Sequence, residues 1–286
     1  MSRRFIFALW LGGLLCASCA TPGQVGVKTP QNNGSGGPEY PPVLDASPAR
    51  QQASESARRA LAQEHQLPDT LRCDCDPILL TPRALPMEAA GRIQVVRQNP
   101  FTDLELKEAL RHFIEIQARL LGVNPGDTAI GQPQLSLVTL SVTLSHEGAL
   151  TRVVYQQRSF PYPIVDGYGT LEFTLCKSGH LLQWRSSLLP NVTLPARPTL
   201  ETSALPERFV NREFTYSNIA GQPLRYRVAR ADEVFVKEAV VYPRLTSTRL
   251  TIHLAYPIVV GLGTTWTIYV DAMTGEELAV KPNFVS

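Results

Sequence analysis

The sequence has few charged residues and almost no surplus of either sign. Charged residues make up 18% of the 286 residues, and the formal net charge is +2. No basic run with interleaved aromatic residues occurs, so nothing in the charge pattern supports nucleic acid or strongly acidic molecules as partners. We therefore expect a globular protein that does not bind nucleic acid.

Long apolar runs are also missing after the first residues. No later segment offers the roughly 20 uncharged apolar residues that a transmembrane helix requires. The start of the chain reads Met1-Ser2-Arg3-Arg4 and is then apolar from Phe5 to Cys16. This is the layout of a secretory signal peptide, so we expect residues 1–18 to direct export.

The end of this leader resembles the bacterial lipoprotein signal. Ala17 and Ser18 precede Cys19, which in such proteins is lipidated and becomes the new N-terminus. The resemblance implies a membrane anchor at Cys19. With Ala20 rather than an aspartate next, it implies an outer-membrane lipoprotein of the cell envelope that faces the periplasm or the surface. The alternative is cleavage after a small-x-small triplet, which would release a soluble protein.

Catalytic and metal-binding motifs are absent from the sequence. His146-Glu147 is the only His-Glu pair, and Leu150 stands where the H-E-x-x-H zinc motif requires its second histidine. There is no G-x-S-x-G elbow, no phosphate-binding glycine loop and no C-x-x-C redox motif. We expect a protein that is not an enzyme and binds no metal or cofactor. An active site assembled from distant residues is the alternative.

Three cysteines would remain in the folded protein, namely Cys73, Cys75 and Cys176. An exported protein meets an oxidising compartment in which disulfides persist. Because the number is odd, at least one thiol stays free or pairs outside the chain. A disulfide from Cys176 to Cys73 or Cys75 is preferred over a metal site, since no second Cys or His pair stands at ligand spacing.

Sequence composition divides the rest of the chain. Residues 19–48 are rich in small and polar residues and are predicted to be a disordered linker. Residues 49–90 are predicted to be an irregular N-terminal extension, with 49–68 as a short solvated helix. The proline-rich segment Thr193–Pro206 is a plausible boundary between two units, 91–192 and 193–286.

The residue patterns in both units predict an α+β fold. Thr102 and Glu105 form a capping box at the start of an amphipathic helix that runs to Leu121, where Gly122 ends it. Strands of the first unit are predicted at Leu135–Leu144, Leu150–Gln157, Thr170–Cys176 and Leu181–Ser187. Strands of the second unit are predicted at Leu224–Ala229, Val234–Tyr242, Arg249–Tyr256, Thr264–Asp271 and Glu277–Lys281. A helix followed by adjacent antiparallel strands forms a helix-on-sheet layer.

Two segments resemble the propeptides of thermolysin-type metallopeptidases. Val153–Gln157 followed by Pro163-Ile164-Val165 is similar to the fungalysin/thermolysin propeptide (FTP) motif, and Trp266–Leu278 resembles the closing hairpin of the PepSY module. The resemblance implies two cystatin-like or PepSY-like units. Three residues of the second segment are expected to form the hairpin turn, in agreement with their turn-forming side chains: Asp271, Thr274 and Gly275.

Such propeptides restrain a peptidase or help it to fold, and no peptidase domain follows in this sequence. We therefore expect an envelope-anchored binding protein that acts in trans as inhibitor or folding chaperone of a secreted metallopeptidase. The alternative is a structural or assembly lipoprotein without a peptidase partner. In the loop Ser159–Gly169, Tyr162 and Tyr168 are candidate partner contacts, although the loop also reads as an ordinary strand connection.

Overall fold

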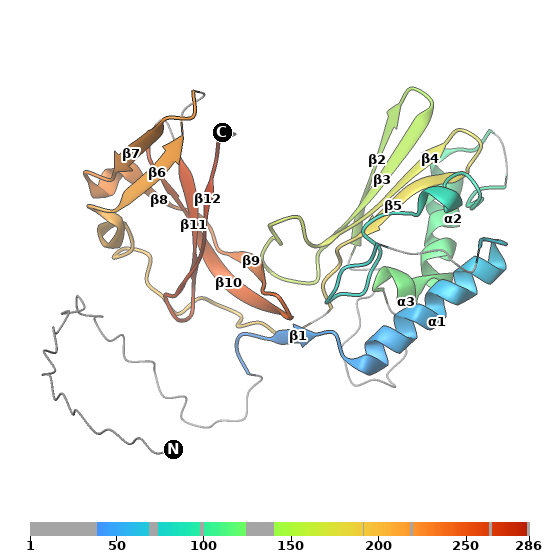
Figure 1. The fold of residues 1–286 in the computed structure, drawn as a ribbon, viewed down its shortest axis with the longest axis horizontal. Helices are drawn as coiled ribbons and strands as arrows, with labels where there is room; N and C mark the ends of the chain where they lie inside the picture. The colour runs from blue at the N-terminus through green and yellow to red at the C-terminus, as the bar shows by residue number, and fades with distance from the viewer. Residues whose placement is uncertain are drawn as a thin grey trace, which may run out of the picture. The chain divides into compact units, whose positions relative to one another are not determined.

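The computed structural model describes residues 39–68, 74–97, 100–123, 140–190, 192–217, 220–262 and 265–284. Within these ranges the chain has few helices and three antiparallel sheets, of four, six and two strands (Figure 1). The predicted α+β class is therefore confirmed. All described residues belong to one compact unit that spans 36–286.

The first sheet contains β2 (Leu140–Glu147), β3 (Leu150–Gln157), β4 (Thr170–Cys176) and β5 (Leu181–Ser186) in sequence order. All its pairings are antiparallel. Buried and exposed residues alternate along β3 and β4, as expected for strands with one face in a core. Three of these strands lie where their sequence patterns predict them, and residues 135–139 of the fourth lie outside the described residues.

The predicted helix forms α2 (Asp103–Ile116) and a short continuation, α3 (Ala118–Leu121). The capping box at its start is present: Glu105 N donates to Thr102 Oγ1 at 3.3 Å, and Thr102 N donates to Glu105 Oε2 at 2.7 Å. Gly122 ends α3 with a φ of 76°, a left-handed conformation that glycine adopts without strain. The prediction of one unbroken helix is wrong at Gln117, where the backbone leaves helical geometry.

The apolar face of α2 packs on the first sheet. The ring of Phe113 lies 6.0 Å from that of Phe173 and 5.8 Å from that of Trp184. Leu106 and Leu110 are fully buried in the same core. This helix-on-sheet layer is the one that the sequence predicts.

The segment before this layer contains the short helix predicted at 49–68, but this helix is partly buried rather than solvated. This helix is α1 (Pro48–Glu64), whose N-cap Ser47 accepts a hydrogen bond from Arg50 N. Leu61, 1% exposed, and Leu67, 6% exposed, belong to the core beneath α2. Because only a few apolar residues of α1 pack in this core, its mostly polar composition is typical of a solvated helix.

The second sheet is organised around one long strand, β10 (Arg249–Val260). One edge of β10 pairs with β9 (Val240–Leu245) and β8 (Val234–Val236). The other edge pairs with β11 (Trp266–Asp271), which in turn pairs with β12 (Glu277–Pro282). The single strand predicted at 234–242 is thus divided in two, and β10 is four residues longer than predicted.

No α-helix covers this sheet within the described part of 193–286. The described helical turn nearest the start of this part is a 3-10 turn, Pro206–Phe209, whose first residue is a proline. A hairpin packs on this sheet instead, formed by β6 (Glu213–Ser217) and β7 (Pro223–Arg227). Strand β6 was not predicted from the sequence. Phe214 and Tyr226 stack on Trp266; their ring centroids lie 4.7 Å and 5.4 Å, respectively, from that of Trp266.

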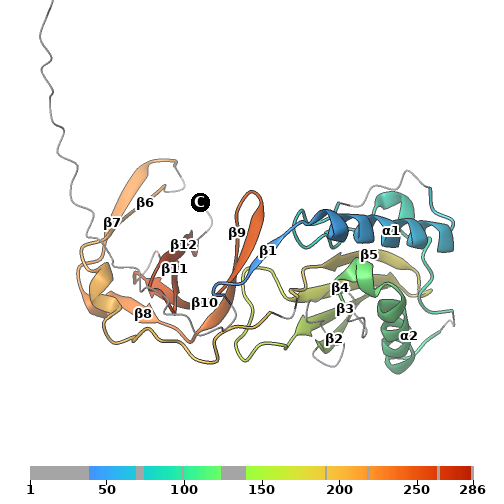
Figure 2. The ribbon, with the colours of Figure 1, turned by 90° about the horizontal axis from the view of Figure 1, so that it is seen from below.

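A three-residue strand, β1 (Val43–Asp45), completes the second sheet by pairing with the start of β10 (Figure 2). Leu44 of β1 is only 5% exposed. The prediction of a disordered linker up to residue 48 is therefore wrong at its C-terminal end, because these residues gain backbone bonds and a buried side chain. Residues 19–38 lie outside the described residues.

Candidate functional site

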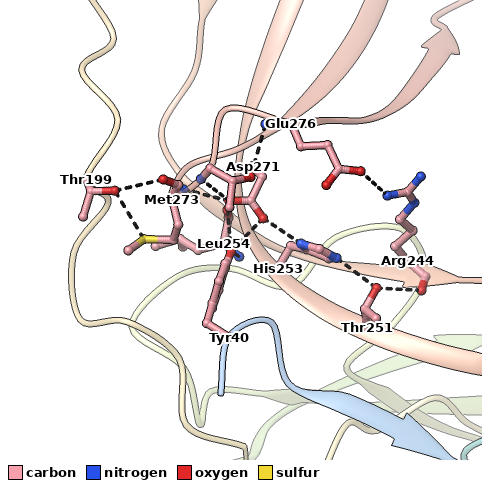
Figure 3. Close-up of polar contacts among 10 residues, drawn as sticks. Tyr40, Thr199, Arg244, Thr251, His253, Leu254, Asp271, Met273 and Glu276 are labelled. Atoms are coloured by element: carbon pink, nitrogen blue, oxygen red, sulfur yellow. Dashed lines mark hydrogen bonds and ion pairs between the residues drawn. The ribbon is translucent and has the colours of Figure 1, made fainter. Parts of the chain in front are cut away.

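A buried polar network lies where β1, β10 and β11 meet (Figure 3). The side chains of His253 and Asp271 are 6% and 2% exposed, and their Nδ1 and Oδ2 atoms are 2.7 Å apart. Tyr40 donates its hydroxyl proton to the same carboxylate oxygen at 2.9 Å. Three segments far apart in sequence therefore share one carboxylate.

The hairpin turn holds this carboxylate in place. Asp271 Oδ1 accepts hydrogen bonds from the backbone N–H groups of Met273, at 2.8 Å, and Thr274, at 2.9 Å. Gly275, with a φ of 75°, donates its N–H to the carbonyl of Asp271. The residues singled out as turn formers, Asp271, Thr274 and Gly275, thus shape the turn, and Asp271 also reaches across the sheet.

The hydroxyl of Tyr40 completes the backbone ladder on one edge of β10. Ile252 N donates to the carbonyl of Pro42 at 3.0 Å, whereas Leu254 N donates to the hydroxyl of Tyr40 at 3.0 Å. The carbonyl of Leu254 accepts from Ala272 N, next to the end of β11. The tyrosine side chain therefore fills the place between β1 and β11 where no strand supplies an acceptor.

The electrostatics of the network favour an ionised carboxylate beside a neutral phenol. Burial alone would raise the pKa of Asp271, but hydrogen bonds from His253, the Thr274 and Met273 backbones, and Tyr40 lower this pKa below its usual value. Burial, followed by the charge of Asp271, raises the pKa of Tyr40 far above its usual value. Tyr40 therefore stays protonated and remains a donor.

The network also has the hydroxyl, imidazole and carboxylate order of a hydrolytic triad, because Thr251 Oγ1 lies 2.9 Å from His253 Nε2. A triad needs a reachable nucleophile and free donors for an oxyanion. Thr251 sits between β1 and β9, and its hydroxyl also donates to the carbonyl of Arg244 at 3.3 Å. The nearby N–H of Leu254 already donates to the Tyr40 hydroxyl, so it is not free to bind an oxyanion. The geometry is that of a structural hydrogen-bond network that joins neighbouring strands.

Sequence reasoning missed Tyr40 and His253 as members of this network. Tyr40 lies in the predicted linker, and His253 is one of several histidines scattered along the sequence, so neither position indicated a role. The one available signal is that Thr251 and His253 share a face of a predicted strand beside the Asp271 hairpin. The register that brings these residues together is not visible in the sequence.

Tyr162 and Tyr168 do not project freely from the loop Ser159–Gly169. Both are half-buried in an apolar cluster that includes Val241, and the Tyr162 hydroxyl donates to the carbonyl of Ala196. Val165 N donates to the carbonyl of Val241 at 3.1 Å, and Val241 N donates to that of Pro163 at 2.9 Å. The loop is thus bonded to β9, which leaves only part of each tyrosine for a partner.

Among the described residues, the preferred disulfide is not formed. Cys176 carries a free thiol, whose Sγ lies 3.0 Å from Ser178 Oγ in the turn after β4. No disulfide joins Cys176 to Cys75 in this structure, whereas pairing of Cys176 with Cys73 stays a prediction. Cys73 and the expected lipidation site Cys19 lie outside the described residues. Within the described ranges, no group of three His, Cys, Asp or Glu residues could hold a metal ion.

The outer strand of the first sheet, β2, is exposed along most of its length. Six of its eight residues are exposed, and only Leu140 and Leu144 turn partly towards the core. Among the described residues β2 pairs only with β3, and no described strand covers its other edge. No proline or lysine occurs in β2, although these residues often block strand addition at edges.

Comparisons with known proteins do not identify a family. No protein-family model matches the chain, and no curated protein matches it. A solved structure titled "Bacillus megaterium YpeB C-terminal domain" aligns over 84% of this chain and 98% of that chain, at 9% identity and a TM-score of 0.27. A likeness at this score carries no argument about function. In the part of the chain that the structure describes, no helix is long and apolar enough to cross a membrane.

Proposed function

We propose that this chain is a non-enzymatic binding protein, anchored in a bacterial cell envelope through a lipid on Cys19. It acts in trans as inhibitor or folding chaperone of a secreted thermolysin-type metallopeptidase. The resemblance of 153–165 and 266–278 to propeptide segments supports the class of partner. The observation that carries the binding role is the open edge of β2.

Strand addition to β2 is the simplest way for this chain to engage a peptidase. A partner segment that lies along the edge gains main-chain hydrogen bonds, while alternate side chains give specificity. On one face it would extend the row of Leu140, Val142 and Leu144, of which Val142 is 37% exposed. On the other face it would meet the exposed side chains of Ser141, Thr143 and Ser145. The partner segment should therefore alternate apolar and polar residues.

The buried Tyr40–Asp271–His253 network supports a role without catalysis. Its polar atoms are saturated by partners inside the protein, and its bonds join strands of one sheet. In this proposal the network stabilises the second sheet and takes no part in any chemistry. The lipid on Cys19 fixes where the binding occurs.

The direct test is a peptidase assay with the full chain carrying Cys19→Ala, which removes the lipid. We expect dose-dependent inhibition of at least one thermolysin-type peptidase, or a higher refolding yield of that peptidase. Neither effect at high micromolar concentration, across several such enzymes, would contradict the proposal.

A structural or assembly lipoprotein is the second candidate, because an open strand edge serves an envelope partner equally well. Co-purification of the lipidated protein from the envelope separates the two. A secreted metallopeptidase in the eluate supports the first proposal. Only envelope components in the eluate would support the second.

A further inference from the structure

Residues 40–45 lie on β10 in the way that a bound peptide is added to a sheet. Val43, Leu44 and Asp45 pair antiparallel with Thr251, Leu250 and Arg249. Ile252 N then donates to the carbonyl of Pro42 at 3.0 Å. Backbone bonds of this kind give a strand-addition site its affinity, whatever the sequence of the added segment.

Two side chains four residues apart anchor this segment. Leu44 is 5% exposed and lies in an apolar cluster with Leu250 and Ile252. Tyr40 accepts from Leu254 N, donates to Asp271 Oδ2 and places its ring edge-on to His253, with centroids 6.2 Å apart. Between the anchors, Val43 is 51% exposed.

The residues between the anchors suit this edge of the sheet. Pro41 and Pro42 have no backbone N–H, so this stretch leaves no donor unpaired while the Pro42 carbonyl accepts from β10. The site therefore selects a tyrosine, prolines that need no acceptor, and an aliphatic residue four positions after the tyrosine.

The edge of β10 would survive departure of the segment. Residues 250–254 of β10 are paired on their opposite edge with β9, and residues 255–260 are held by β11. The segment itself contributes a three-residue strand and two anchor side chains. Segments with so few contacts open locally at a lower free energy than the core strands around them.

We propose that the β10 edge from Arg249 to Leu254 is a peptide-binding site, which the chain fills in cis with its own residues 40–45. The ligand class is an extended peptide of the form Tyr-Pro-Pro-x-aliphatic. This site is separate from β2, and the proposal does not rest on the peptidase partner.

The test uses a fluorescent peptide of residues 39–46 and the full chain with Cys19→Ala. In the chain that also carries Tyr40→Phe and Leu44→Ser, the peptide should displace the weakened segment from the β10 edge. The fluorescence anisotropy of the peptide should therefore rise to saturation as this chain is added. The parent chain should bind at least about 100-fold more weakly, because its own segment competes at an effective concentration in the millimolar range. A Leu224→Ser chain, altered at an exposed residue of β7, is the matched control and should behave like the parent.

A second peptide with phenylalanine in place of Tyr40 tests the anchor. It should bind the weakened chain about tenfold more weakly, since it cannot bond Asp271 and Leu254. No binding of either peptide to a weakened chain that folds, or equal binding of both, would overturn the proposal.

Hydrogen exchange of the parent chain provides a readout that needs no folded variant. The amides of Ile252 and Leu254 should exchange through local opening, well before the amide of Ile258 opposite β11. If Ile252 and Leu254 exchange only with global unfolding, the segment is an integral strand and the proposed site does not exist.

Discussion

At the residue scale, Asp271 shows both the reach and the limit of sequence reasoning. Its role in the hairpin follows from local chemistry, because an aspartate and a glycine at this spacing form a turn. Its bonds to His253 and Tyr40 join residues 18 and 231 positions apart, and no local pattern encodes such contacts. The same carboxylate therefore has a predictable local role and an unpredictable long-range role.

Tyr40→Phe tests the long-range role. Without the hydroxyl, the N–H of Leu254 and one oxygen of Asp271 each lose a partner in a buried place, so we expect a loss of about 1–3 kcal/mol in the free energy of unfolding. Urea unfolding at neutral pH measures it. Tyr162→Phe, which removes a hydroxyl bonded to the Ala196 carbonyl at the exposed surface, is the control and should cost less than about 1 kcal/mol. Equal losses in both variants would mean that the Tyr40 hydroxyl is not a special anchor.

The lowered pKa of Asp271 makes part of the stability depend on pH. Because this pKa lies below the unfolded-state value of about 4, the unfolded chain binds the proton more readily than the folded one. The stabilisation is therefore complete above about pH 4 and is lost as the pH falls through the folded-state pKa. A carbon-13 NMR titration of the Asp271 carboxyl should give a midpoint below its usual value; a midpoint above it would contradict the network as described.

At the element scale, elements with a strong pattern were predictable and elements with a thin apolar face were not. The helix at 103–116 and strands β3 and β4 follow from a capping box and alternating apolar residues. The burial of α1 could not be predicted, because its sequence is mostly polar and depends on Leu61 and Leu67 for packing. The hairpin β6–β7 was recognisable only in its second strand.

Leu61→Ala tests whether α1 belongs to the core. Removing a buried leucine should cost about 2–5 kcal/mol in the free energy of unfolding. Met87→Ala, at a residue 90% exposed, is the control and should change stability by less than about 0.5 kcal/mol. If Leu61→Ala is as mild as its control, α1 is a solvated extension after all.

At the scale of the whole molecule, the sequence predicts an exported α+β binding protein, and we propose two strand edges, those of β2 and β10, as its binding sites. The open edge of β2 and the filled edge of β10 depend on strand order and register, which residue patterns leave undetermined. The export signal and Cys19 are read from the sequence alone.

Cys19→Ala tests the anchor. Without the thiol no lipid can be attached, so the protein should move from the membrane fraction to the soluble fraction while its melting temperature stays unchanged. Fractionation followed by immunoblotting measures this. A Cys16→Ala variant is the matched control and should remain with the membrane; retention of the Cys19→Ala protein would contradict lipidation.

The central claim, that the chain binds a peptidase through β2, is tested most directly by the dissociation constant of that complex. The measurement compares the parent chain with Thr143→Lys on β2 and with Thr215→Lys, a control at an exposed threonine of β6. A lysine on an open edge blocks strand addition, so we predict at least about tenfold weaker binding for Thr143→Lys and no change for Thr215→Lys. Unchanged binding by Thr143→Lys, or equal weakening by both substitutions, would contradict the claim.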